Sequence, residues 1–400
     1  MKKNFLIILA LCVSALWAGN SIFSYEGFPV QYYGRDIYSL GMGDTGASDI
    51  FRYNTGYANP AMQNRGNRTL FGTGIMMGYA IYDSEYNGKN ENFRDDMLDF
   101  PYFSMSVPLG RHRLGMQFNA QASGLVNNQT ELADGTIEKQ STDKYLYKAD
   151  LIYSANYKKF NAGISANLYF GHDKQSFTQI SSNNMFNTYE SLVRDFKNPS
   201  VTVGALQSFD NLSLGAHASL PVTLKGESVR STIHSTEPET DYEYKLPAQY
   251  NFSATYLPIK QFKLAADISY EPWSAIADTY RDGMKAGLGF AYEPDVDLHR
   301  TIFMRLPMRI GASYRQLAFS DKDGGDIDEI ALSYGLTLPL KREVNRIDFG
   351  FQYLKRGDLA TNNLSDTTLS LMIGFTGFDI ISKPKDRRAP REIPTKEAVE

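Results

Sequence analysis

The sequence is poor in cysteine and lacks any second long apolar run. Its one cysteine, Cys12, lies inside an N-terminal apolar segment that extends from Phe5 to Trp17. A chain with so little cysteine has no disulfide framework and no thiolate metal site. Beyond this segment, no stretch reaches the roughly 18 consecutive apolar residues that a membrane-spanning helix requires. The sequence therefore excludes a helical membrane protein.

The first residues have the pattern of a secretory signal peptide. Two lysines precede the apolar segment, and the small residues Ala18 and Gly19 come after it. This pattern predicts cleavage after Ala18, with Ala15 as an earlier alternative and an uncleaved anchor as the competing interpretation. We therefore assign residues 1–18 to a signal peptide, which removes Cys12 from the mature chain.

Charge of one sign is not in excess either. The formal net charge is −4, and no basic patch predicts a nucleic-acid partner. Aromatic residues are abundant by contrast, with 26 Tyr and 24 Phe. Tyrosine in particular suits the aromatic girdles that flank the apolar band of a membrane barrel.

From about residue 68 to residue 380, apolar and polar residues alternate. In the stretch 262–271 the even positions are Phe262, Leu264, Ala266, Ile268 and Tyr270, and the odd ones include Lys263, Asp267 and Glu271. Successive side chains of a strand point to opposite faces, so one face suits lipid and the other suits water. This pattern is typical of a transmembrane β-barrel.

Fourteen stretches carry the alternation, and an even number is what a single-chain bacterial barrel requires. They are 68–82, 99–109, 112–125, 144–157, 159–172, 199–209, 211–223, 247–257, 260–272, 283–293, 306–319, 327–339, 344–356 and 366–379. The predicted fold class is all-β, a transmembrane antiparallel β-barrel of about 14 strands with an N-terminal plug.

The connections between these stretches alternate between long and short. Long polar loops are predicted at 83–98, 126–143, 175–198 and 225–246, with tight turns at Gly110-Arg111, Lys158, Asp210 and Pro258-Ile259. Outer-membrane barrels place short turns in the periplasm, so this order predicts the bacterial outer membrane with the N- and C-termini periplasmic. The connection 294–305 is longer than such a turn should be.

Two segments lie outside the predicted barrel at 68–380. Residues 19–67 are rich in glycine and lack alternation, while a barrel of this size has a lumen that needs filling. We predict that this segment is a hatch or plug inside the lumen. Residues 381–400 mix basic, acidic and proline residues, a composition that predicts a charged periplasmic tail.

One glycine-rich stretch, Gly41 to Gly46, matches the dinucleotide fingerprint. That fingerprint needs a buried strand before it and a helix after it. No hydrophobic strand precedes the stretch, and Asn59-Pro60 interrupts the segment after it. We therefore interpret it as a turn within the plug and predict no cofactor.

An acidic stretch offers a weak calcium candidate in a predicted external loop. Its carboxylates are Asp321, Asp323, Asp326, Asp328 and Glu329, set around two glycines. Calcium prefers hard oxygen ligands on a flexible backbone, but the spacing does not match an EF-hand loop. A solvated loop tip is the favoured interpretation, so no metal site is predicted.

The sequence does not favour an enzyme. The five histidines, His112, His172, His217, His234 and His299, have no ligand spacing, and no Gly-x-Ser-x-Gly elbow or Walker loop occurs. His217 is predicted to be a lumen-facing wall residue. A barrel-borne hydrolase with serine and histidine on one strand face stays open as an alternative, because triad members need not be close in sequence.

Charged residues are predicted along the lumen face, where they would pair across the lumen and keep it wet. They are Lys263, Asp267, Glu271, Lys285, Glu293, Arg309, Arg315 and Asp348. Arg309 and Arg315 are the candidates for contact with an anionic ligand head group. The sequence does not show which charge faces which.

Three stretches go beyond a generic barrel. The first is Leu40-Gly41-Met42-Gly43-Asp44-Thr45-Gly46-Ala47, followed by Asn59-Pro60-Ala61. The second consists of Leu246–Tyr250, Asp267–Tyr270 and the pair Trp273-Ser274. The third consists of Arg309–Ala312 and Lys355-Arg356-Gly357. In these stretches the chain resembles the FadL-type outer-membrane transporter superfamily. The resemblance spans most of the mature chain, although each motif is short and rich in glycine.

The resemblance implies a barrel of fourteen strands with a hatch and a side opening in the wall. It implies that Gly41, Met42, Gly43, Asn59, Pro60 and Ala61 belong to the hatch. It also implies passage of long-chain fatty acids or other hydrophobic molecules by diffusion. The alternative is a non-enzymatic component of a type IX secretion system, like the PorV-type relatives, or a surface scaffold. The partners expected are outer-membrane lipid and lipopolysaccharide, a hydrophobic ligand and, in the alternative, secretion-system proteins.

Overall fold

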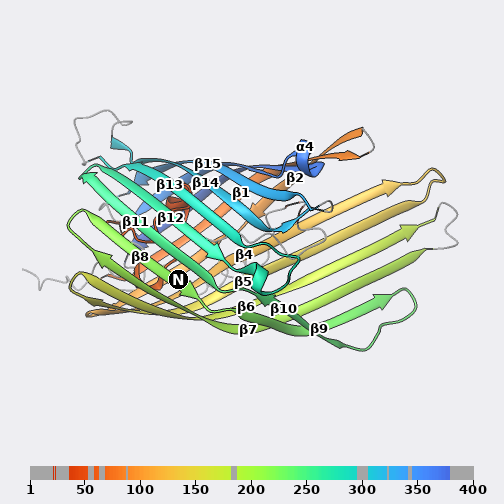
Figure 1. Ribbon diagram of the computed structural model, residues 1–400, viewed down its shortest axis with the longest axis horizontal. Coiled ribbons are helices and arrows are strands. Elements are labelled where there is room, and N and C mark those ends of the chain that lie inside the picture. Colours follow the sequence, from red (N-terminus) through yellow and green to blue (C-terminus); the bar gives the residue numbers. More distant parts are fainter. Residues whose placement is uncertain are drawn as a thin grey trace, which may run out of the picture.

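The wall of the molecule is one antiparallel sheet that closes on itself (Figure 1). The computed structural model describes residues 21, 23, 36–52, 58–62, 68–86, 89–181, 187–294, 305–321, 324–340 and 345–378. Its strands are β1 (Leu70–Tyr86), β2 (Lys89–Asp99), β3 (Tyr102–Leu109), β4 (His112–Glu131), β5 (Ile137–Tyr157), β6 (Phe160–Ile180), β7 (Thr188–Ser208), β8 (Leu212–Ser219), β9 (Val222–Thr232), β10 (Thr240–Leu246), β11 (Gln249–Ile259), β12 (Phe262–Glu271), β13 (Gly283–Tyr292), β14 (Met308–Ser320), β15 (Asp326–Pro339), β16 (Arg346–Arg356) and β17 (Leu364–Phe378). Pairing of β1 with β17 closes the ring.

Three of the wall strands are each divided in two by a break at a proline. The breaks fall at Phe100-Pro101, Leu220-Pro221 and Pro247-Ala248. The two pieces pair with one continuous neighbour in the first two cases, β2 and β3 with β1, and β8 and β9 with β7. Proline cannot donate to the ladder, which explains why the pairing stops there. Joining the pieces turns 17 strands into 14, so the predicted barrel of about 14 strands is confirmed.

The long loops predicted at 83–98, 126–143, 175–198 and 225–246 are wrong for most of their length. The β4–β5 ladder continues to Glu131 and Ile137, and the β6–β7 ladder continues to Gln179 and Thr188. Figure 1 shows these hairpins extending beyond the rest of the barrel on the right. Their sequences are polar on both strand faces, so they resemble loops although backbone pairing alone builds them.

The opposite end of the barrel carries the tight turns. Leu109 pairs with His112 and Tyr157 pairs with Phe160, so each turn has two residues between paired strands. Gly110 and Lys158 have φ values of 68° and 59° in these turns. Two-residue hairpin turns need such positive φ values because they must match the twist of the strands. The longer connection that was predicted at 294–305 lies almost wholly outside the described residues.

The outward face of the wall is apolar, and the inward face is polar. Leu288, Ile310 and Leu332, on three neighbouring strands, are 68%, 60% and 55% exposed. The inward neighbours Lys263, Asp267 and Arg309 are buried. An outward band of this kind is suited to lipid rather than water. No helix among the described residues is long and apolar enough to cross a membrane.

Short N-terminal segments occupy the interior. They include helix α2 (Ile37–Leu40) and the 3-10 turn η2 (Pro60–Met62), and all the residues of both are buried. Phe23 packs against the inward-facing Leu317 and Ile327, towards the hairpin end of the barrel. The remaining short elements, η3 (Trp273–Ala275) and α4 (Leu359–Asn362), lie in connections at that end. The predicted signal peptide and charged tail lie outside the described residues.

Candidate functional site

Glycines in the wall form a seat for the N-terminal segment at its Gly-rich stretch. A β-carbon on Gly289, Gly311 or Gly335 would collide with the backbone of Met42 or Gly43, or with the side chain of Arg309. Gly289 and Gly311 are register partners on β13 and β14. Side chains are therefore missing from the wall where the plug backbone runs across the strands, and only glycine permits so close an approach.

Hydrogen bonds fix the same stretch to the wall. The Gly43 nitrogen donates to Ser333 Oγ at 2.9 Å. The nitrogens of Gly46 and Ala47 donate to the two oxygens of the Asp267 carboxylate at 3.2 and 3.1 Å. The carboxylate of Asp267, predicted as a lumen charge, therefore accepts hydrogen bonds from two backbone donors of the plug.

A second contact of the plug is made on the other side of the ring. Asn59 Nδ2 lies 3.4 Å from the carbonyl oxygens of Ala205 and of Ala216. Its side chain also accepts from the Ala61 nitrogen at 2.9 Å, which begins the η2 turn. A β-carbon on Gly163 or Gly204 would collide with this turn. Both predicted hatch stretches, 41–43 and 59–61, thus lie directly against wall glycines, while their role as a hatch stays a prediction.

Tyr38 is the centre of a buried charged cluster at the tight-turn end. Its ring has four cationic groups around it, at centroid distances of 4.2 Å for Arg52, 5.2 Å for Lys263, 4.2 Å for Arg309 and 5.4 Å for Arg346. Cations are attracted to the face of an aromatic ring, most strongly when both are withdrawn from water. Tyr38 is therefore a contact through which the plug engages several strands at once.

Carboxylates balance the cations of this cluster. Lys263 Nζ lies 2.9 Å from Asp49 and 3.0 Å from Glu293, while the Tyr38 hydroxyl donates to Glu293. Arg309 lies 3.2 Å from Asp348. Buried charges need partners of this kind, because an isolated buried charge is strongly destabilising. The plug and the wall each contribute charges that the other neutralises.

Asp36 and Arg52 form a buried pair within the plug segment itself. Arg52 donates to both oxygens of Asp36, at 2.5 and 3.1 Å, and to Ser39 Oγ at 2.8 Å. Burial raises the pKa of Asp36, but the charge and hydrogen bonds of Arg52 outweigh burial and lower the pKa to about 2. The pair fixes the start of α2, since Asp36 also accepts from the Ser39 nitrogen.

Arg309 and Arg315 were the predicted contacts for an anionic ligand. Arg309 is 1% exposed and packs against Tyr38 and Asp348 of the closed cluster. Arg315 lies on the same strand, closer to the hairpin end, and interacts with Glu271 and Glu329. Their contact with a ligand stays a prediction, but both positions are engaged by protein groups in this structure.

The remaining predicted lumen charges also have protein partners. Lys285 pairs with Asp44 of the plug. Glu271 accepts from Trp273 Nε1 at 2.8 Å and from Gln249 at 3.1 Å. His217 is buried on the inward face of β8, as expected for a wall residue.

The acidic stretch that was a weak calcium candidate is divided between different partners. Arg281 lies 2.6 Å from Asp326 and 3.3 Å from Asp328. Asp321 accepts from the Gly325 nitrogen and from Asn362, each at 2.6 Å. Asp323 lies outside the described residues. Within the described ranges, no three ligating side chains come together.

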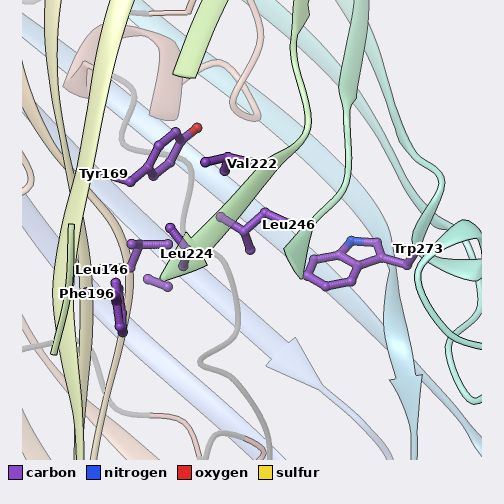
Figure 2. Packing of buried hydrophobic residues seen from close by; sticks show 8 residues of the cluster. Leu146, Tyr169, Phe196, Val222, Leu224, Leu246 and Trp273 are labelled. Atoms are coloured by element: carbon purple, nitrogen blue, oxygen red, sulfur yellow. The ribbon is translucent and has the colours of Figure 1, made fainter. Parts of the chain in front are cut away.

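A cluster of buried apolar residues, called the apolar chamber below, lies on the lumen side of the wall, on the hairpin side of the plug (Figure 2). Its buried residues are Ala122, Leu146, Tyr169, Phe196, Val222, Leu224, Leu246 and Trp273. They come from β4, β5, β6, β7, β9, β10 and η3, so the chamber lies beside the wall breaks near Pro221 and Pro247. A pocket lined by Leu146, Tyr169 and Glu271 among others has a volume of about 20 Å³, enough for one water molecule.

Tyr38 and the chamber were not found from the sequence. Tyr38 is one of 26 tyrosines, and nothing local distinguishes it. The wall glycines did carry a signal, because Gly289, Gly311 and Gly335 occupy inward positions on successive strands. Empty inward positions on neighbouring strands indicate that backbone from elsewhere approaches them.

Comparison with known proteins places this barrel in a family. The model of the BamG family matches residues 1–379 of the chain. The chain belongs to the BamG family. A search of the curated proteins found no relative similar enough to count as a match.

Several solved barrels have the same fold. The toluene transporter TodX of P. putida superposes with a TM-score of 0.64 at 16% identity, over 87% of this chain and 99% of TodX. The toluene transporter TbuX of Ralstonia pickettii gives 0.60 at 14% identity, over 89% and 100%. A FadL homologue of Pseudomonas aeruginosa gives 0.60 at 12% identity, over 88% and 98%. The predicted likeness to FadL-type barrels is therefore confirmed for the fold.

Proposed function

We propose that this BamG-family barrel lies in the bacterial outer membrane and passes hydrophobic or amphipathic small molecules by passive diffusion. The observation that carries the proposal is the apolar chamber between the plug and the outer hairpins. Eight buried apolar residues from seven elements gather there, more than in any other apolar cluster among the described residues. Such residues offer weak sites for apolar ligands, and weak sites allow release as well as binding.

The names of the fold neighbours support the same class of ligand. TodX and TbuX are toluene transporters, and CymD is a monoaromatic hydrocarbon channel with a TM-score of 0.60 at 15% identity. Long-chain fatty acids remain the other candidate, from the resemblance of the sequence. The proposed function is transport without an enzymatic step, so it involves no covalent chemistry and no cofactor.

A sideways route through the wall suits the fixed plug better than a route along the axis. β3 pairs with β4 as far as Tyr102 and Asn119. Beyond that point β2 pairs with β1, β4 pairs with β5, and no pairing joins β2 to β4 among the described strands. Ala122 of the chamber lies on β4 just past this split. Ligands would therefore leave the chamber through the split, without displacing the Tyr38 cluster.

The positions of the strand ends support an orientation. β1 begins and β17 ends at the tight-turn end, and outer-membrane barrels place tight turns in the periplasm. The chain would then enter and leave the wall on the periplasmic side, with the long hairpins outside.

The proposal is tested by the molecules that co-purify with the barrel. The full-length protein is extracted from outer membranes with a lipid-preserving copolymer and its hydrophobic contents are identified by mass spectrometry. Val222→Trp, which fills the chamber, should deplete the bound molecule severalfold, while Leu288→Trp on the outward face should not. If both variants and the wild-type protein carry only bulk membrane lipid, the transport proposal is wrong.

A second candidate function is a scaffold or secretion-system component, like the alternative drawn from the sequence. The observation that favours it is the number of wall strands that hold the plug: α2 contacts β16 and β17, and η2 contacts β5, β6 and β7. The long hairpins would then bind partner proteins. A deletion strain with normal hydrocarbon uptake but failed surface display of secreted proteins would favour the scaffold.

A further inference from the structure

Asp150 is a buried carboxylate with all its described partners on one oxygen. It points inward from β5 and is 4% exposed. Its Oδ2 receives Gln117 Nε2 at 2.5 Å, Asn119 Nδ2 at 3.4 Å and Lys148 Nζ at 3.5 Å. Its Oδ1 is buried and has no hydrogen-bond partner among the described residues. A buried acceptor without a partner costs free energy, so this oxygen indicates a donor that the protein does not supply.

A second orphan acceptor lies beside it. The Oδ1 atom of Asn119 is also buried without a partner in the described part of the chain. Its amide orientation is fixed, because reversing it would place the amide oxygen against the Asp150 carboxylate. Asn119 is the register partner of Lys148, and Gln117 is the register partner of Asp150, on the adjacent strands β4 and β5. Two free acceptors thus lie together on one patch of the lumen wall.

This acceptor patch adjoins the apolar chamber. Leu146 of the chamber precedes Lys148 and Asp150 on the same inward face of β5, so the three are arranged in a row at spacings of about 7 Å. Tyr169 of the chamber is the register partner of Lys148, and its ring centroid lies 6.0 Å from Lys148 Nζ. A chain-like ligand in the chamber would therefore place its polar end at Asp150 and Asn119.

We propose that the barrel selects amphiphiles whose polar end donates hydrogen bonds, such as a primary alcohol or an ammonium group on an aliphatic chain. On binding, the apolar side chains of the chamber move apart to take the tail, and the head donates to Asp150 Oδ1 and Asn119 Oδ1. This inference rests on the proposed function and narrows its ligand class. A carboxylate brings only acceptors, and the nearest cation, Lys148, already lies against Asp150, so ionised fatty acids are disfavoured.

The test compares ligands that share one tail. Binding of dodecanol, dodecylammonium, dodecyl methyl ether and dodecanoate to the full-length barrel in lipid nanodiscs is measured by displacement of a fluorescent alkyl probe. We expect dodecanol and dodecylammonium to bind roughly tenfold more tightly than the ether, because only they satisfy the orphan acceptors. Dodecanoate at neutral pH should bind no better than the ether.

The Asp150→Ala variant should remove this preference and leave the affinity of the ether within about twofold. The matched control is Asp210→Ala, which removes an exposed carboxylate in a turn. Should Asp150→Ala fail to fold, Asn119→Leu and the wild-type ligand series still decide the question. Equal affinities for alcohol and ether would mean that internal water satisfies these acceptors, which overturns this inference and leaves the proposed function intact. Failure of all four ligands to bind would overturn both.

Discussion

The backbone nitrogen of Gly43 lies where the β-carbon of any larger residue at position 311 would have to be. Gly43 itself has a φ of 69°, a value that side chains rarely tolerate, and backbone atoms of Leu288 and Ala312 crowd around it. The close fit therefore depends on glycine on both sides: one to turn the plug backbone and one to clear the wall.

Gly311→Ala should displace the plug while leaving the wall intact. A β-carbon at this position meets backbone, which cannot move aside as a flexible side chain can, so the plug has to lift from β14. We expect trypsin to cleave after Arg52, which is 5% exposed in the seated plug, much faster in the variant. Ala312→Val, one residue on and facing outward, is the control. Unchanged cleavage in Gly311→Ala would show that the seat is looser than described.

Lys263→Met should destabilise the protein by about 3 kcal/mol, because it takes a buried cation away from the buried carboxylate of Asp49 and from Glu293. Lys263 contacts Asp49 at 2.9 Å and Glu293 at 3.0 Å, so one substitution weakens a plug group and a wall group together, although Asp49 keeps Arg52 at 3.4 Å and Glu293 keeps the Tyr38 hydroxyl. The free energy of unfolding is measured by urea titration in lipid vesicles. Adding Asp49→Asn to Lys263→Met should recover part of the loss. A double variant less stable than the sum of the two single changes would contradict the pairing.

Acidification should loosen the plug between about pH 4 and pH 2. The pKa of Asp36 falls from an ordinary value of 3.8 to about 2, since its pairing with Arg52 outweighs burial. A lowered carboxyl pKa contributes stability that is present above pH 4 and is lost as pH falls towards 2, here about 2 kcal/mol. Burial raises the pKa of Glu293, but Lys263 and the Tyr38 hydroxyl lower it to about 2, so Glu293 titrates in the same window.

The measurement is the mobility of a spin label attached to the cysteine of Phe51→Cys. The label should attach at this position alone, because Cys12 is the only native cysteine and lies in the predicted signal peptide. Label mobility should rise as the pH falls from 4 to 2. Asp36→Asn should flatten part of this rise, with Glu293 responsible for the remainder. A label that stays immobile at pH 2 would show that these two carboxylates do not hold the plug.

The alternation of apolar and polar residues was sufficient to predict which stretches form the wall strands, but not how long those strands are. In 262–271 the odd positions, such as Lys263 and Asp267, are inward as expected, because one face had to meet lipid. The β6–β7 hairpin has no such constraint beyond the apolar band. Backbone pairing continues there to Gln179 and Thr188 through residues whose polar composition predicts a loop. The extent of a strand is therefore predictable only where burial dictates the pattern.

The sequence also could not predict which lumen charges pair with each other, because that depends on the register between strands. Arg309 and Asp348 are 39 positions apart and meet only because β14, β15 and β16 are neighbours in a fixed register. The sequence could therefore identify Arg309 as lumen-facing but not as part of the Tyr38 cluster. Glycine patterns are different, because the missing side chain at Gly311 is visible in the sequence even though its partner is not.

The outward apolar band predicts that a charged residue placed on it destabilises the barrel, and more so the nearer it lies to the centre of the bilayer. Leu288 lies midway along β13 and is 68% exposed, so Leu288→Arg would place a guanidinium near the centre of the bilayer. We expect it to destabilise the barrel by about 2–4 kcal/mol in urea unfolding from lipid vesicles. Ile233→Arg, at the tip of the β9–β10 hairpin and 52% exposed, should change stability by less than about 0.5 kcal/mol. Equal effects at the two positions would contradict the assignment of the outward face to lipid.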